Sequence, residues 1–187
     1  MGRWQPNARG RLEQAAMELF AERGFEATTV AEIAERAGLS ERTFFRHFAD
    51  KREVLFGGGG QLDELLVDAV ASAPASTAPL DAVTAGLEAV AEVLRERRDF
   101  AGKRQAIIAA NPELRERELI KLASWASAIA GALRERGVDE LGASVAGEVG
   151  VAVFRIALQR WLDGPADADL ARLVRESVRR LGALVSA

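Results

Sequence analysis

The 187-residue sequence contains no cysteine and no tyrosine, and its only histidine is His47. The absence of cysteine excludes disulfide bonds, thiol nucleophiles and cysteine-ligated metals. A single histidine without a second imidazole or a carboxylate cluster beside it does not favour a metal site or a general base. We therefore expect no catalytic residue, no metal and no cofactor, which argues against an enzyme.

Long apolar runs are also missing. The longest uncharged runs, such as residues 122–133, fall short of the ~20 residues needed to cross a bilayer, and the N-terminal MGRWQPNARGR lacks an apolar signal core. No stretch alternates apolar and polar residues for long enough to predict a strand. We expect a soluble, cytoplasmic protein without contact to a membrane.

Lysine is scarce, with 3 lysines against 22 arginines, and the net charge is -3. A negative chain does not bind nucleic acid indiscriminately, so any DNA contact must come from a local basic surface. Residues 1–56 contain nine basic and nine acidic residues and are neutral as a whole. Binding by this part would depend on which face carries the cations.

Helical spacing of apolar residues extends along nearly the whole chain. Leu12, Ala15, Ala16, Leu19 and Phe20 share one face of a first helix, which Gly24 can end. Further helices are predicted at residues 80–98, 101–110, 112–136, 139–163 and 167–185. Their boundary signals are first-turn prolines, N-cap side chains and C-cap glycines: Pro79, Pro112, Asn111, Asp167, Gly137 and Gly164. We predict an all-α fold of about nine helices.

The most informative stretch is TTVAEIAERAGLSERTFFRHFADKREVL, residues 28–55. Thr29 and Glu32 form a capping box that begins one short helix, and Ser40 can cap a second that ends near His47. Gly38 lies in the turn between them, where a left-handed residue is needed. This pattern predicts a helix-turn-helix, whose second helix can enter a major groove. Its small core would consist of Ile33, Ala34, Ala37, Leu39 and Phe44.

The sequence resembles the tetracycline-repressor (TetR) family of bacterial regulators in three consecutive motifs, A-x-x-x-G, S-x-x-T-F-F-x-H-F and the following D-K-x-E. The resemblance implies a three-helix DNA-binding head at residues 1–50 and a larger helical ligand-binding and dimerisation domain at 51–187. A second segment, residues 111–137 (NPELRERELIKLASWASAIAGALRERG), resembles the C-terminal domain of the mycofactocin-regulator type, which is associated with acyl-CoA-like ligands.

The same resemblance implies the DNA contacts. Glu41, Arg42, Thr43 and Arg46 would meet bases, and Arg42 can read a guanine edge through two hydrogen bonds. Thr29, Ser40, His47 and Lys51 would hold phosphates. Phe45 stands where the family often has a phosphate-binding tyrosine, so we expect it to pack more than to bind. A solvated face at Arg42 and Arg46 is the alternative. Arg3, Arg9 and Arg11 form either an arm along the DNA or a disordered end.

Residues 57–60 are four consecutive glycines inside a segment, 51–71, that otherwise keeps one helical phase. Each glycine costs a helix about 1 kcal/mol relative to alanine. No strand precedes the run and no G-K-[S/T] follows it, so a phosphate loop is disfavoured. We interpret 51–71 as the helix that couples head and sensor, with Gly57–Gly60 as a soft point; the alternative is a close helix crossing.

In the larger domain, Ala143, Ala146, Gly147 and Gly150 allow close helix approach. With the last helix they would build a four-helix interface in a homodimer, as the family resemblance implies. Glu148, Ala152, Arg155 and Gln159 share one stripe, which lines a ligand cavity or forms an exposed edge or an ion pair across the dimer.

Other candidates for the ligand pocket are aromatic or basic. Trp125, Phe154 and Trp161 would wall a pocket or belong to the core, and the cluster at 97–104 that includes Arg104 would meet phosphates or face water.

These observations predict a dimeric, ligand-responsive transcriptional regulator. It would be a repressor released from a near-palindromic double-stranded DNA operator by a small apolar or acyl-CoA-like effector. The alternatives are an activator of the same fold and a helical interaction protein that binds no DNA. Selective DNA binding separates the first two from the third.

Overall fold

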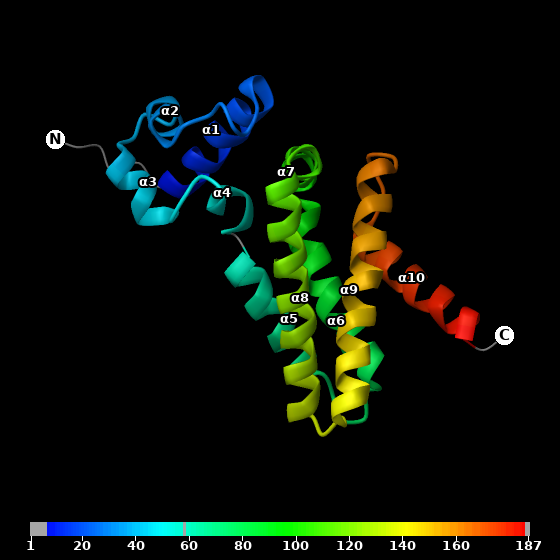
Figure 1. Ribbon diagram of the computed structural model, residues 1–187. Helices are drawn as coiled ribbons and strands as arrows, with labels where there is room; N and C mark the ends of the chain where they lie inside the picture. Colours follow the sequence, from blue (N-terminus) through cyan, green and yellow to red (C-terminus); the bar gives the residue numbers. More distant parts are fainter. Residues whose placement is uncertain (1–6, 58, 186–187) are drawn as a thin grey trace. The chain divides into compact units, whose positions relative to one another are not determined.

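The computed structural model describes residues 7–57 and 59–185 (Figure 1). Within these ranges the chain forms helices and no strand, which confirms the all-α prediction. The helices are α1 (Ala8–Arg23), α2 (Val30–Arg36), α3 (Glu41–His47), α4 (Glu53–Phe56), α5 (Gly59–Ser72), α6 (Pro79–Arg95), α7 (Arg98–Ala110), α8 (Pro112–Glu135), α9 (Glu140–Asp163) and α10 (Leu170–Val185). They number ten in the described ranges because the helix expected at 51–71 is assigned as α4 and α5.

The helices group into two compact units. The first is Met1–Gly59 with Gly102–Glu118, and the second is Gly60–Ala101 with Leu119–Ala187. Glycines stand at two of the three places where the chain passes between units, at Gly59 and Gly60 and at Gly102. By compactness, α4 and residues 102–118 of α7 and α8 go with the helix-turn-helix rather than with the larger unit that a boundary at residue 50 would give.

The first unit contains the predicted helix-turn-helix. Thr29 caps α2 through the full capping box with Glu32, and Ser40 caps α3 by accepting from the Thr43 backbone N–H. Gly38 between them has φ +63, the left-handed conformation that a side chain would strain. The predicted core is buried except for Leu39, which is half-buried. Its buried members are Ile33, Ala34, Ala37 and Phe44.

Arginines of the first unit hold its turns together. Arg9 donates to the Gly57 carbonyl and Arg11 to the Ala37 carbonyl, so both serve inside the fold and not as the arm that was one reading of the sequence. Arg3 lies outside the described residues. At Gly57 a Cβ would lie 2.5 Å from the Glu53 carbonyl oxygen, so glycine is needed there for space.

Two further arginines surround Phe56 at the end of α4. Arg104 of α7 donates to the Leu55 carbonyl, and its guanidinium lies 5.0 Å from the Phe56 ring centroid. Arg117 pairs with Glu53 and lies 5.7 Å from the same centroid. The Glu53 carboxylate is therefore used by Arg117, while the Glu53 N–H donates to the Asp50 carboxylate.

In the second unit, glycines of α6 and α9 bring helices close together. A Cβ at Gly147 of α9 would lie 2.4 Å from the Ala126 carbonyl oxygen of α8, and one at Gly150 would lie 2.5 Å from Val83 of α6. Gly86 of α6 packs in the same way on Leu66 of α5. The assignment of Ala143, Ala146, Gly147 and Gly150 to a dimer interface was therefore wrong. These small residues are buried against helices of their own chain.

α9 is not buried all round. By length and composition alone it could cross a membrane, but its buried residues belong to the core shared with α6 and α10. The opposite stripe is exposed and includes Leu141, Val145 and Ile156, which are 73%, 53% and 56% exposed. This pattern fits a core helix with one free face better than a membrane helix.

The ends of α9 and the start of α10 are fixed by side chains. Asp139 caps α9 by accepting from the Gly142 N–H. Arg98 donates to the carbonyls of Trp161, Gly164 and Pro165 at the other end. Because Arg98 satisfies these terminal carbonyls, it is not a free phosphate ligand. The cap near α10 is Asp169, two residues after the predicted Asp167, and α10 begins at Leu170.

Candidate nucleic-acid interface and effector site

Most basic residues of the head form ion pairs or hydrogen bonds inside the first unit. Of the nine basic residues in 1–56, Arg3 lies outside the described residues, which leaves eight. Six have acceptors: Arg9, Arg11, Arg23, Arg36, Lys51 and Arg52. The acceptors are either carboxylates or main-chain carbonyls. The other two, Arg42 and Arg46, lie on α3 and are available to an anion from outside the chain.

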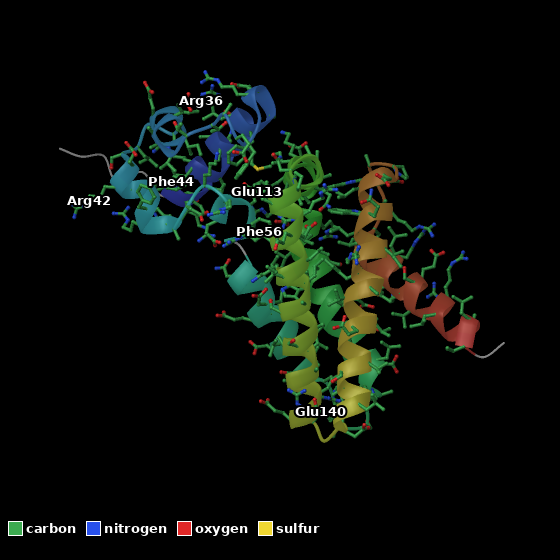
Figure 2. The ribbon with its side chains drawn as sticks, viewed as in Figure 1. Arg36, Arg42, Phe44, Phe56, Glu113 and Glu140 are labelled. Carbon is green, nitrogen blue, oxygen red and sulfur yellow. The ribbon has the colours of Figure 1, made fainter. Side chains whose placement is uncertain are left out.

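These two arginines lie on one face of α3. Arg42 and Arg46 are exposed, and neither has an ion pair or hydrogen bond within the described residues. Figure 2 shows Arg42 extending away from the helices of this unit, whereas Phe44 lies among them. Positions 42, 45 and 46 share one side of a helix, since three and four residues make about one turn. The face opposite the buried Phe44 thus presents two cations and an aromatic ring.

Phe45 is 54% exposed and meets Phe44 edge-on, with ring centroids 5.5 Å apart. Phe45 thus packs on Phe44 by one edge, and the expectation that it packs more than it binds stays a prediction. Its ring is presented outward beside Arg42 and Arg46, where an aromatic side chain can contact a thymine methyl group.

The hydroxyl groups at the starts of α2 and α3 hold the turns. The Thr29 hydroxyl and backbone N–H both donate to the Glu32 carboxylate, which lowers the pKa of Glu32. The Ser40 and Thr43 hydroxyl oxygens lie 3.0 Å apart. Glu41 is exposed in the first turn of α3. Both caps lie at exposed helix N-termini, where backbone N–H groups favour an anion.

Lys51 has a different task from the expected phosphate contact. Its Nζ donates to the carbonyls of Phe25, Glu26 and Thr28 at 2.8, 3.2 and 3.1 Å. It also lies 4.4 Å from the Phe25 ring centroid. An ammonium has three N–H donors, so these acceptors occupy all of them. Lys51 ties the loop before α2 to the segment after α3, and it has no donor left for a phosphate.

His47 ends α3 and is half-buried beside Phe48. Its Nε2 atom is buried and has no hydrogen-bond partner within the described residues. A phosphate contact by His47 would therefore have to use the other ring nitrogen, Nδ1.

The six candidates for the effector pocket do not form one group. Glu148, Arg155 and Gln159 lie on the exposed stripe of α9, so the reading of this stripe as a cavity wall was wrong for the chain by itself. Arg104 belongs to the first unit, where it pairs with Glu118, and burial lowers its pKa. Arg104 thus donates to the Leu55 carbonyl of α4 and to the Glu118 carboxylate of α8.

Trp125 and Phe154 are the pair that the structure brings together. Their ring centroids lie 5.4 Å apart, and both are buried in the second unit. The Trp125 indole N–H donates to Asp63 of α5, whose carboxylate also pairs with Lys121 at 2.5 Å. Asp63 and Lys121 are each about one-third exposed. Sequence reasoning missed both, since 58 residues separate them and no local pattern links them.

Two family profiles match this chain. Residues 13–56 match the profile described as bacterial regulatory proteins, tetR family, and residues 77–186 match the MftR C-terminal domain. Together they cover the helix-turn-helix and most of the second unit.

Individual relatives agree with the profiles. The regulator TcmR of Streptomyces glaucescens is 41% identical over 88 residues, which are 47% of this chain and 39% of TcmR. The protein named as the mycofactocin biosynthesis regulator MftR of Mycobacterium tuberculosis is 30% identical over 135 residues, 70% of this chain and 66% of MftR. The chain thus spans less than two thirds of the length of either relative.

Among solved structures, the repressor FadR of Thermus thermophilus in complex with lauroyl-CoA is 27% identical. The match covers 91% of each chain with a TM-score of 0.59.

Proposed function

Because this chain belongs to the TetR family of bacterial regulatory proteins, we propose that it is a cytoplasmic transcriptional repressor that releases its operator when it binds a small effector. The observation that carries the proposal is the free face of α3. Arg42, Phe45 and Arg46 are presented outward there, whereas the other described cations of the head have acceptors inside it. Two outward cations on the second helix of a helix-turn-helix suit a major groove.

The side chains of α3 other than the buried Phe44 then have tasks on DNA. Arg42 reads a guanine through O6 and N7, Arg46 contacts a neighbouring base or phosphate, and Phe45 meets a thymine methyl. Glu41 can accept from a cytosine amino group, and Thr43 can meet a base edge.

Phosphates meet the helix starts. The Ser40 hydroxyl holds them, together with His47 Nδ1. A phosphate contact at Thr29 would have to replace the bonds from its N–H and hydroxyl to Glu32. These contacts set the register of α3 in the groove and add no sequence preference of their own.

The protein acts as a homodimer in this proposal, so that two α3 helices meet two half-sites about one helical turn apart. The exposed apolar residues of α9, Leu141, Val145 and Ile156, provide a surface for the second copy. An exposed apolar stripe of this kind on a helix is typical of an interface.

For the effector we propose an acyl-CoA-like molecule. Support comes from the Thermus thermophilus FadR complex with lauroyl-CoA and from the resemblance of residues 77–186 to the MftR C-terminal domain. Trp125 and Phe154 would contact the apolar chain, and the Asp63 and Lys121 pair would lie at its polar end. An effector shifts the population of DNA-competent chains only by its difference in affinity for the two states.

Selection of bound fragments from the source genome, followed by fluorescence anisotropy at two salt concentrations, tests the DNA part. We expect binding to the selected site to exceed binding to unrelated DNA by about a thousandfold or more. Equal affinity for both DNAs would refute a specific regulator and favour a helical interaction protein.

Titration of lauroyl-CoA into the DNA complex tests the effector part, with coenzyme A and laurate as controls. Release by lauroyl-CoA and by neither control supports the proposed class. Selective DNA binding without release would keep the regulator and reject this effector. A reporter gene behind the selected site then separates repression from activation by the direction of its response.

A further inference from the structure

The exposed stripe of α9 carries two opposite charges in an apolar setting. Glu148 and Arg155 are exposed on the same side of the helix as Ala152. Leu141 and Val145 precede this group and Ile156 follows it. Position 155 lies seven residues after position 148, and seven residues make about two turns, so both charges point in nearly the same direction.

Neither charge has a partner in the part of the chain that the structure describes. Glu148 and Arg155 have no hydrogen bond or ion pair within residues 7–57 and 59–185. Their Cα atoms are about 10 Å apart along the axis, because each residue rises about 1.5 Å, so a direct pair along the helix is disfavoured. When a second molecule covers the apolar stripe, both charges lose water. Such burial is costly unless each charge meets an opposite one.

A two-fold axis between the two copies would give each of these charges an opposite charge as its partner. In an isologous contact, if residue i of one copy meets residue j of the other, then j also meets i. The midpoint between positions 148 and 155 lies beside Ala152, whose small side chain lets two helices approach closely. An axis that crosses α9 there, perpendicular to the helix, brings Glu148 of each copy to Arg155 of the other.

We propose that Glu148 and Arg155 form two reciprocal ion pairs across the homodimer and thereby fix the register of α9 against its second copy. The inference rests on the homodimer of the proposed function and adds the device that sets its geometry and partner choice. If the two α9 helices packed in parallel with an axis along them, Glu148 would face Glu148 and Arg155 would face Arg155. Like charges across an interface are unfavourable, so this arrangement is rejected.

The pairing also selects the partner. A related regulator with a different order of charges on this stripe would place like charges together and would be excluded. Partner choice by charge order is the same device that coiled coils use at their flanking positions.

Charge exchange tests the proposal. The variants are Glu148→Arg, Arg155→Glu, the double exchange of both, and a mixture of the two single variants. Arg160→Glu is the matched control, because Arg160 is an exposed arginine of α9 about 140° around the helix from Arg155. Sedimentation equilibrium gives the dimer Kd of each, and native mass spectrometry gives the composition of the mixture.

Each single variant places two like-charge contacts in the dimer, and we expect its Kd to rise about tenfold or more. The double exchange restores both pairs with reversed sign, so its Kd should return to within about threefold of the unmodified chain. In the mixture, one partner carries two arginines and the other two glutamates, so the heterodimer should dominate. Arg160→Glu should leave the Kd unchanged.

Two results would overturn the inference, and they differ in what else they affect. If the unmodified chain is dimeric but the double exchange is no better than the single variants, the ion pairs are wrong and the homodimer stands. If the unmodified chain is monomeric, the stripe of α9 serves a different partner, and both the inference and the dimer of the proposed function fail.

Discussion

Replacing Lys51 by methionine separates a structural lysine from a DNA-binding one. The substitution keeps most of the aliphatic stem and removes the three donors that hold the carbonyls of Phe25, Glu26 and Thr28. A hydrogen bond contributes about 1 kcal/mol net, so three at a half-buried ammonium contribute roughly 2–3 kcal/mol. For a chain of this size, such a loss lowers Tm by about 4–12 °C.

The assay for this prediction has two parts. Thermal unfolding followed by circular dichroism gives Tm, and the salt dependence of DNA affinity, measured well below Tm, counts phosphate contacts. We expect Lys51→Met to lower Tm and to leave the slope of log K against log salt unchanged, and Lys51→Arg to recover part of the loss. An unchanged Tm with a slope reduced by about 0.9 would show that Lys51 holds a phosphate after all, and would refute this reasoning.

Three further predictions concern the close helix crossing, the capping box and the missing tyrosine. Gly147→Ala should destabilise the protein by about 1–3 kcal/mol, because the added Cβ would lie 2.4 Å from a backbone oxygen. Gly131→Ala in α8 is the control, since the nearest atom to its Cβ would be the end of an arginine side chain at 3.8 Å. This variant should stabilise the protein by up to about 1 kcal/mol. Urea unfolding of both variants gives the comparison, and equal signs would contradict the crossing of α8 and α9. The hydrogen bonds from Thr29 hold the pKa of Glu32 below its ordinary value of 4.5, so this group stabilises the fold above pH 4.5 and loses that contribution as pH falls through its lower pKa in the folded state. Glu32→Gln should therefore show a smaller loss of stability in acid than the unmodified chain, while Glu26→Gln, at an exposed site, should behave as the unmodified chain does; identical acid profiles for all three would count against the capping box. Phe45→Tyr adds a hydroxyl to an exposed ring and should tighten operator binding by about three- to tenfold through a phosphate hydrogen bond, with Tm unchanged; an unaltered anisotropy titration would mean that residue 45 faces no phosphate.

Local signals explain why the helix-turn-helix was predictable. Thr29 with Glu32, Gly38 and Ser40 each act within three or four residues, so the sequence alone predicts where α2 and α3 begin and how the turn between them is made. The same is true of Gly137, which has φ +88 at the end of α8. Such signals depend on backbone chemistry and need no knowledge of the distant chain.

Orientation and distant partners were not predictable in this way. Periodicity shows that Gly147 and Gly150 share one side of α9 and that Glu148 and Arg155 share another, but it does not show which side meets the core. Lys51 contacts carbonyls 23 to 26 residues away, and Asp63 meets Lys121 across 58 residues. These roles depend on packing between elements, and no pattern in a single sequence records it.

The soft point at Gly57–Gly60 stays a prediction. Gly57 is required for space beside Glu53 and Arg9, while a Cβ at Gly60 would meet nothing within 4 Å, and Gly58 lies outside the described residues. The alternative of a close contact therefore accounts for the first glycine and not for the last. Alanine at Gly60 should stiffen α5 without a clash, and its effect on effector release would test the coupling role.

The central claim is that Arg42 on the free face of α3 reads a base. The most direct measurement is the affinity of the unmodified chain and of Arg42→Ala for a set of selected operators in which each base pair is changed in turn, with Arg115→Ala, an exposed arginine of α8, as the control. We predict that Arg42→Ala loses about 1–3 kcal/mol on the selected operator and loses discrimination at one guanine in each half-site, while Arg115→Ala keeps the original pattern. An unchanged base preference in Arg42→Ala would contradict the account.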